Sequence, residues 1–474
     1  MMQSHAPSAP IQPIADDAAL NTLRSSLRGE LIRREDNEYD TIRSIWNGMI
    51  DRRPALIARC LGVADVRAAL SFARAHQLAV SVRGGGHNIA GLAVSDGSMM
   101  IDLSRMRGVR VDPSSRTAHA QAGCLLSDVD RETQVHGLAA VLGFVSTTGI
   151  AGLTLGGGFG YLTRRFGWTS DTVRSMEVVT ADGDVVQASD DVNPDLFWGL
   201  RGGGGNFGIV TNFEYQLFPV GPQILGGGIA WRGEEAPLVL ERYRALLRDA
   251  PPGMACVAAL RKAPPAPWID KEVHGKSIVA LFICHTGPIE EGERLVNDLR
   301  AVGKPVGDVV QRRSYLSQQA LLDATQPKGR RYYWKSEYLP SLEPDMVAPL
   351  LEHAGRIASP HSAMLLFPLD GAVDALPTNH SAVGNRDARL VLNIAGAWDA
   401  AGDDDVNIDW ARGAWQQLRR FSTGGSYINF QTDDEGDDRI HAAYGANHER
   451  LVDIKTTWDP HNTFRLNKNI APRG

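Results

Sequence analysis

The sequence contains few cysteines for its length. Four occur among 474 residues: Cys60, Cys124, Cys256 and Cys284. None forms a CxxC pair or stands at metal-ligand spacing from a histidine, which excludes a disulfide framework and a cysteine-ligated zinc site. The thiols are expected to be buried or incidental. No metal site is predicted, because several histidines stand singly and are expected to be structural: His119, His136 and His285.

A long apolar run is also missing. No stretch reaches the ~18 uncharged apolar residues that a membrane span requires. The opening segment MMQSHAPSAPIQPIADD has neither a positively charged start nor an apolar centre, so it does not resemble a secretory signal. We therefore expect no membrane partner and a cytoplasmic location.

An excess of positive charge is absent as well. The chain has 49 Lys and Arg against 55 Asp and Glu, a formal net charge of −6, so nucleic acid is not an expected partner. Acidic residues cluster at 403–405 and 433–438, but neither cluster has the full ligand pattern of a calcium loop. Both are expected to be solvated loops.

Glycine is abundant, with 49 residues, many of them in short tracts. Clustered glycine favours backbone packed closely against a ligand. Hydrophobic residues make up 43% and charged residues 22%, as in globular proteins, and the length predicts two large domains or several small ones.

The pattern of elements changes along the chain. A helix is predicted over 63–77, followed by a strand over 79–83 that leads into three glycines. Strands over 98–106, 108–123 and 175–189 and a helix over 125–137, without regular βαβ alternation, predict an α+β domain for residues 1–220. Residues 221–432 are predicted to be a second domain, with helices at 238–250 and 290–303 and strands at 277–285, 332–339, 363–369 and 389–398. Helix signals return in a C-terminal segment, 433–474.

Three glycine tracts carry the strongest functional signal. The first, RGGGHN, covers 83–88, the second lies within 147–160, and the third, RGGGGNFGIV, covers 201–210. Consecutive glycines leave backbone amides unshielded, so they can form a nest for phosphate oxygens. One tract alone also fits an ordinary tight turn. Three tracts in one domain favour an extended cofactor, and the companion acidic residue of a nicotinamide fingerprint is missing.

These motifs, in this order, resemble the FAD-linked oxidases of the vanillyl-alcohol oxidase and berberine-bridge-enzyme-like superfamily. The resemblance rests on RGGGHN, TGIAGLTLGGGFGYLTRRFGWTSD, ADGDVV, DLFWGLRGGGGNFGIVTNFEY and YGANHERLVDIKTTWDPHNTFRLNKNI. It implies an α+β fold: an FAD-binding domain of two α+β subdomains, an inserted substrate domain whose antiparallel sheet is covered by helices, and a C-terminal segment that completes the FAD domain.

The resemblance also implies a cofactor site. In that family the histidine of the first motif bonds covalently to the flavin, so it implies FAD attached through His87. Some members make a second link from a cysteine at the position of Val145, so this chain resembles the single-link branch. The implied cofactor-binding residues are Arg83, Gly84, Gly85, Gly86, His87, Asn88, Thr148, Gly149, Gly152, Thr154, Gly157, Gly158, Gly160, Gly208, Ile209, Val210, Asn467 and Asn469.

The substrate side is expected to come from the second domain. The segments YYWKSEYL (332–339) and SYINF (426–430) are predicted to be strands, and alternate residues of a strand face one side. They give the candidate substrate residues Tyr333, Lys335, Asn429 and Phe430. In several relatives the position of Phe430 is a tyrosine that acts as the base, and phenylalanine has no ionisable proton. Tyr427 and Tyr444 are therefore the candidate catalytic residues, each with the alternative of a packing role.

The implied reaction is oxidation of a small alcohol, sugar or amine by hydride transfer to the flavin, which O2 reoxidises to give H2O2. Thr148 is close in shape to the valine of oxygen-using relatives, which favours an oxidase. Two alternatives stay open: a flavin dehydrogenase with another acceptor, and a non-catalytic flavin- or ligand-binding protein. A monomer or a homodimer is expected.

Overall fold

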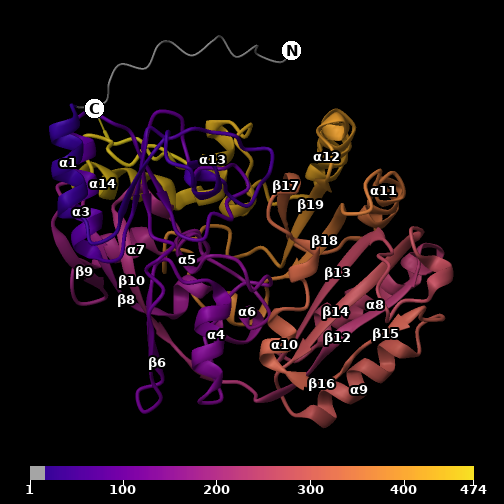
Figure 1. Ribbon diagram of the computed structural model, residues 1–474. Helices are drawn as coiled ribbons and strands as arrows, with labels where there is room; N and C mark the ends of the chain where they lie inside the picture. Colours follow the sequence, from indigo (N-terminus) through magenta and orange to yellow (C-terminus); the bar gives the residue numbers. More distant parts are fainter. Residues whose placement is uncertain (1–15, 474) are drawn as a thin grey trace.

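A computed structural model describes residues 16–473. The chain forms three main sheets in two halves, and Figure 1 shows the N-terminal half on the left with the C-terminal helices α13 and α14 against it. The α+β fold predicted from the sequence is confirmed.

The first sheet is small and mixed. Its strand order is β1-β2-β4-β3, with β1 antiparallel to β2 and the other pairs parallel. Its strands are β1 (Glu30–Arg33), β2 (Leu56–Arg59), β3 (Val80–Arg83) and β4 (Met99–Asp102). Helix α3 (Val63–Ala75) buries Val66, Ala69, Leu70 and Ala73, the three- and four-residue spacing of an amphipathic helix. The predicted helix over 63–77 is therefore present and ends two residues early.

The second sheet is antiparallel, in the order β5-β6-β10-β8-β9. Its strands are β5 (Val109–Asp112), β6 (Thr117–Gln121), β8 (Val173–Val179), β9 (Val185–Ser189) and β10 (Ile209–Gln216). Gly183 has φ +88° in the turn between β8 and β9, a conformation that suits glycine. Two short strands pair separately, β7 (Leu138–Ala139) and β11 (Phe218–Pro219).

The third sheet is antiparallel and begins directly after these two. Its order is β15-β12-β14-β13-β18-β19-β17, and β16 also pairs with β12. Its strands are β12 (Gln223–Arg232), β13 (Met254–Lys262), β14 (Ser277–His285), β15 (Gly307–Asp308), β16 (Gln311–Ser314), β17 (Arg331–Leu339), β18 (Ala363–Pro368) and β19 (Leu390–Trp398). Strands β12 and β13 are not among the elements predicted from the sequence, because their glycine- and alanine-rich runs have weak strand propensity.

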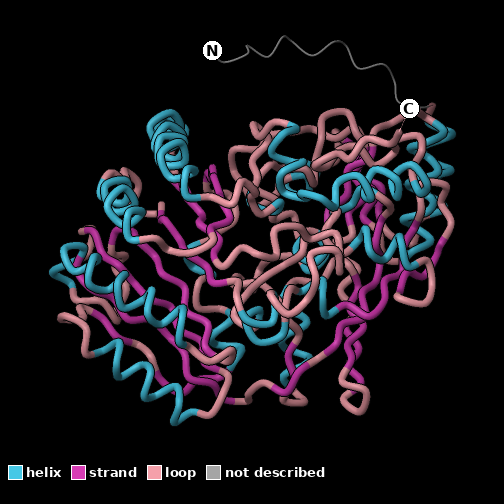
Figure 2. Tube along the Cα trace, turned by 180° about the vertical axis from the view of Figure 1, so that it is seen from behind, coloured by secondary structure: helices cyan, strands magenta, loops and turns pink. Residues whose placement is uncertain are grey.

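Helices cover the outer face of this sheet, away from the other half of the molecule (Figure 1). They are α8 (Ala236–Asp249), α9 (Ile289–Arg300), α11 (Pro344–Gly355) and α12 (Asp404–Leu418). The inner face packs against the N-terminal half through a separate cluster that includes Phe159, Trp168 and Tyr427. From behind, loops fill the region between the two groups of strands (Figure 2). The sheet therefore presents one face to helices and one to the other half.

The remaining helices belong mostly to the N-terminal half. They are α1 (Asp17–Ser26), α2 (Tyr39–Arg43), α4 (Leu126–Gln134), α5 (Ile150–Leu155), α6 (Thr163–Phe166), α7 (Pro194–Leu200), α10 (Tyr315–Gln319), α13 (Asp437–Tyr444) and α14 (His448–Trp458). Leu451 and Ile454 of α14 join the N-terminal hydrophobic core. The C-terminal segment therefore packs with the first half of the chain, although the third sheet separates them in sequence.

Candidate functional site

The first glycine tract leads out of β3 and crosses the second tract. A Cβ atom on Gly85 would collide with the backbone of Gly149, so glycine is required where these two loops meet. Gly86 has φ +68°, a second local demand for glycine. The loop delivers His87 to the wall of a long cavity that runs between the two halves.

The His87 imidazole lies in that wall with an unsatisfied nitrogen. Its Nε2 atom is buried and has no hydrogen-bond partner within the described chain. Burial lowers the pKa of His87 to about 4, so the ring is neutral at pH 7. Buried polar atoms usually have a hydrogen-bond partner, so Nε2 is free to contact another group. The nitrogen of a neutral imidazole is nucleophilic and can therefore form a covalent bond to a cofactor.

A stack of aromatic rings holds this histidine. The Trp46 indole lies parallel to the His87 ring, with 4.2 Å between the centroids, and its other face stacks on Tyr332 at 3.7 Å. The Trp46 indole N–H donates to the Gln326 carbonyl at 3.0 Å. The imidazole orientation is therefore fixed from both halves of the molecule.

The cavity brings together most of the cofactor-binding residues expected from the sequence. The following line it: Gly84, Gly85, Gly86, His87, Asn88, Thr148, Gly149, Gly152, Gly208, Ile209, Val210 and Asn467. A Cβ on Gly152 or Gly205 would meet no atom within 4 Å, so these glycines border open space. Glycine loops from three distant segments thus line one cavity, and their unshielded backbone amides suit the phosphates of a dinucleotide such as FAD.

Six other expected residues do not line the cavity: Arg83, Thr154, Gly157, Gly158, Gly160 and Asn469. Arg83 instead forms a buried two-point ion pair with Asp102, with N···O distances of 2.9 and 2.6 Å. The Thr154 hydroxyl lies 2.7 Å from that of Tyr215. The glycines shape the backbone: the Gly158 N–H donates to the Tyr427 hydroxyl at 3.1 Å. Arg83, Thr154 and Gly158 therefore make contacts behind the cavity wall rather than in the cavity itself.

The inner face of the third sheet forms the other side of the cavity. Along β17 the side chain that reaches it is Trp334, and its neighbours Tyr333 and Lys335 do not line it. Tyr333 belongs to the core between sheet and helices. The expectation that Tyr333 and Lys335 face the substrate is therefore corrected: the alternation of β17 points them to the opposite face.

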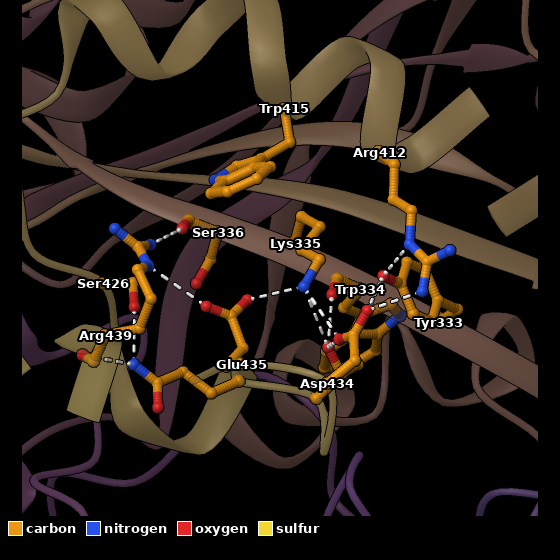
Figure 3. Close-up of polar contacts among 12 residues, drawn as sticks. Tyr333, Trp334, Lys335, Ser336, Arg412, Trp415, Ser426, Asp434, Glu435 and Arg439 are labelled. Carbon is orange, nitrogen blue, oxygen red and sulfur yellow. Dashed lines mark hydrogen bonds and ion pairs between the residues drawn. The ribbon is translucent and has the colours of Figure 1, made fainter. Parts of the chain in front are cut away.

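Lys335 lies at the centre of a charged network on that outer face (Figure 3). Its ammonium is 2.8 Å from an Asp434 oxygen and 2.9 Å from a Glu435 oxygen. Arg439 reaches Glu435 at 3.1 Å, and Arg412 reaches Asp434 at 2.8 Å. The Glu435 side chain is only 2% exposed. The acidic segment 433–438, expected to be a solvated loop, is instead partly buried in this network.

The other acidic cluster, 403–405, is also more than a solvated loop. Asp404 pairs with Arg331 through two short hydrogen bonds and accepts a third from the Trp398 indole at 2.7 Å. Asp403 and Asp405 have no ion pair among the described residues. No group of three or more potential metal ligands occurs in residues 16–473.

Tyr427, Asn429 and Phe430 all line the cavity, as expected. Asn429 and Phe430 lie in a 3-10 turn, η9 (Ile428–Phe430), and Tyr427 directly precedes it, so the expected strand is absent here. The Tyr427 hydroxyl accepts from the Gly158 N–H and from the Asn429 amide at 2.9 Å. Burial raises the pKa of Tyr427, against the weaker lowering effect of these two donors.

Tyr444, the other candidate catalytic residue, also lines the cavity. Its hydroxyl is buried without a partner among the described residues, and burial raises its pKa. It belongs to the N-terminal core rather than to the aromatic cluster around Phe430. The two tyrosines therefore occupy different environments.

Sequence reasoning missed the cavity residues Arg261, Trp334 and Asn393. It also missed Trp46, which stacks on His87. Asn393 had a signal, because it is a polar residue inside the apolar run RLVLNIAGAW. The Asn393 amide oxygen is buried without a partner in the described part of the chain. Trp46 had no signal, since it contacts His87 from a segment with no pattern of its own.

The cavity lies between the three glycine loops and the antiparallel third sheet, and we call it the FAD-type cavity. This arrangement is the one expected of an FAD-linked oxidoreductase. Two family models match the chain: an FAD-binding domain over residues 54–189, and a berberine and berberine-like segment over residues 426–471. The second begins seven residues before the expected boundary at 433 and includes Tyr427 and Phe430.

Other proteins are similar to this chain in sequence or structure over nearly its whole length. (R)-6-hydroxynicotine oxidase of Paenarthrobacter nicotinovorans is 33% identical over 465 residues, covering 95% of this chain and 98% of that protein. The crystal structure of 6-hydroxy-D-nicotine oxidase from Arthrobacter nicotinovorans superposes with a TM-score of 0.84 at 29% identity, covering 94% and 99% of the two chains. BBE-like 1 of Physcomitrella patens shares the fold, with a TM-score of 0.86 at 20% identity, covering 96% and 99%.

The chain belongs to the berberine-bridge-enzyme-like family of FAD-linked oxidases. It is an FAD-linked oxidoreductase. No helix in residues 16–473 is long and apolar enough to cross a membrane.

Proposed function

We propose that this enzyme carries FAD covalently bound through His87 and uses it to oxidise a small amine, alcohol or sugar, with O2 as the final electron acceptor. The observation that carries the proposal is the buried, partnerless Nε2 of His87 in the wall of the FAD-type cavity. When bound, flavin supplies the hydride-accepting chemistry, and the protein supplies binding and orientation.

The glycine loops would hold the cofactor. Residues 84–88 and 148–152 provide backbone amides on one side of the cavity, and residues 204–210 with Asn467 provide the other. The same amides would stabilise negative charge on a reduced ring. Asn467 Oδ1 is buried without a partner among the described residues, so it has an acceptor free for a cofactor donor.

Tyr427 is the residue proposed to orient the substrate. Its hydroxyl oxygen already accepts two N–H donors, from Gly158 and Asn429, so the hydrogen-bonding capacity that remains is donation of its own proton. Because burial keeps this phenol protonated at neutral pH, Tyr427 would donate to the oxygen or nitrogen of the substrate and hold its position. Tyr444 is the second candidate, without such donors.

The aromatic surroundings favour a dry reaction site. Phe159 and Phe430 both pack edge-on against Tyr427, with centroid separations of 4.8 and 4.9 Å. These rings would exclude water from the oxidised carbon and strengthen the polar contacts that remain.

Two observations support O2 as the electron acceptor. Thr148 and Val145 line the cavity, and neither is a charged group that would hold another acceptor. Two of the relatives described above are oxidases by name.

Acid precipitation of the purified enzyme, followed by oxygen and peroxide measurements during turnover, tests the proposal. We expect yellow flavin in the pellet and one peroxide per substrate oxidised. Flavin released to the supernatant would remove the role of His87. Dye reduction without peroxide would show a dehydrogenase instead.

A further inference from the structure

The substrate side of the cavity has an unusual floor. One row of residues crosses four neighbouring strands of the third sheet, in the order Trp334, Ala395, Ala363 and Arg261, each the register partner of the next. All four line the cavity, as do Ala259 and Ala397 beside them. Because alanine leaves the space above the sheet open, the row is a trough with Trp334 at one end and Arg261 at the other.

The ends of this trough differ in their relation to the proposed flavin site. Trp334 packs edge-on against Trp46, with 5.4 Å between centroids, and Trp46 stacks on His87. Trp334 therefore marks the end near the proposed attachment point. With strands about 4.8 Å apart, Arg261 starts from a backbone position roughly 14 Å away.

Arg261 is an unpaired cation at the far end. Its guanidinium makes two long hydrogen bonds to backbone carbonyls, of Lys262 at 3.2 Å and of Pro360 at 3.3 Å. No carboxylate of residues 16–473 lies within ion-pair distance of it, and its Nη1 donates no hydrogen bond within that range. A guanidinium has five N–H donors, so most of its capacity is free.

The charges around Arg261 do not compensate it. Arg330 and His361 are its nearby basic groups, and they share a single carboxylate, Asp399, at 2.8 and 3.0 Å. Burial and the charge of Arg330 lower the pKa of Arg261, which is the direction expected for a cation without an anion. This end of the trough has an excess of positive charge.

The rest of the trough is apolar. Its walls include Leu365, Phe367 and Phe282. Buried polar atoms without a partner among the described lining residues include the amide oxygens of Asn393 and Gln326 and the indole N–H of Trp334. A ligand that matches these walls has a flat or aliphatic body, and a ligand that matches Arg261 has an anionic group. A carboxylate suits a single guanidinium, because the two groups form paired hydrogen bonds.

We propose that Arg261 binds the carboxylate of the substrate, and that the substrate is an apolar or aromatic acid with its oxidisable amine or alcohol at the opposite end, near Trp334. This substrate class rests on the proposed function, since the flavin site defines which end reacts. It sets the enzyme apart from one that recognises neutral sugars, whose many hydroxyls need many polar partners.

Calorimetric titration of the holoenzyme with two matched probes tests the proposal. Phenylbutyrate carries the carboxylate, and phenylbutyramide has the same body with a neutral end. Because a charge-assisted hydrogen bond contributes more than a neutral one, we expect the acid to bind wild-type enzyme about tenfold or more tightly than the amide. Arg261→Met should remove that preference, and Arg261→Lys should retain part of it.

Arg248→Met is the control, because Arg248 is 75% exposed in α8 and its one ion pair among residues 16–473 is with Asp249. It should bind both probes as wild type does. Equal binding of acid and amide to the wild type, failure of both to bind, or an unchanged preference in Arg261→Met would overturn the role of Arg261. Flavin content and peroxide yield, measured on the same preparations, report separately on the proposed function.

Discussion

The indole ring of Trp46 lies almost parallel to the imidazole of His87, with 4.2 Å between centroids and 17° between planes. Tyr332 closes the stack on the far side of the indole, at 3.7 Å and 13°. The Trp46 backbone N–H also donates to the Gly86 carbonyl at 3.0 Å, so ring and backbone both hold the glycine loop. These contacts fix the orientation of the imidazole without help from a bound cofactor.

Replacing Trp46 should slow covalent attachment of flavin. An aromatic stack contributes about 0.5–1.5 kcal/mol, so loss of it in Trp46→Leu should lower the attachment rate roughly two- to tenfold. Trp46→Phe keeps a ring and should retain most of the rate. The measurement is the acid-stable flavin formed over time after FAD is added to apoprotein. A Leu variant that attaches flavin as fast as wild type would show that the stack is only structural.

Removing the Tyr427 hydroxyl should slow flavin reduction. A neutral hydrogen bond contributes about 0.5–1.5 kcal/mol, so Tyr427→Phe, which removes the donor proposed to hold the substrate, should slow reduction roughly two- to tenfold. Tyr444→Phe is the matched control, since both phenols are buried and line the same cavity. Anaerobic stopped-flow reduction measures the rate. If the Tyr444 variant loses more than the Tyr427 variant, the assignment of roles is reversed.

Lys335 should matter for stability rather than for substrate binding. Its ammonium is buried between Asp434 and Glu435, and removal of one partner of a buried ion pair costs about 3–5 kcal/mol. Lys335→Met should therefore lower the urea midpoint while leaving the Michaelis constant unchanged. Lys271→Met, at an exposed position, is the control. An altered Michaelis constant with unchanged stability would return Lys335 to the substrate site.

The same network predicts a dependence of stability on pH. Burial alone would raise the pKa of Asp434. Hydrogen bonds from Lys335, Thr432, Tyr333 and Arg412 outweigh this effect and bring the pKa below the ordinary carboxyl value. A lowered pKa in the folded state stabilises the fold above the unfolded pKa of about 3.9, and this stabilisation is lost as pH falls below it. Asp434→Asn should be less stable than wild type at neutral pH, and the gap should close in acid. A gap that is constant with pH would contradict this.

The glycine tracts could be interpreted from sequence because their signal is local. The backbones of Gly85 and Gly149 meet where a Cβ atom would not fit. A run of glycines in the sequence indicates such a requirement directly. His87 follows the first tract, so its place in the cavity wall could be predicted.

The orientation of β17 could not be predicted in the same way. All but the first residue of this strand are buried, so the sequence shows no alternation between polar and apolar residues to mark its two faces. Tyr333 and Lys335 were expected in the cavity, yet it is Trp334 that lines it. Arg261 and Trp46 could not be found either, because their roles depend on neighbours that are distant in sequence.

Attachment of the flavin to His87 can be measured by peptide mass spectrometry. Tryptic cleavage after Arg83 and Arg105 releases residues 84–105, in which His87 is the only histidine and no cysteine occurs. We expect this peptide to carry the added mass of the flavin, fragmentation to place that mass on His87, and His87→Ala to yield the peptide unmodified. An unmodified wild-type peptide, or a flavin located on another peptide, would contradict it.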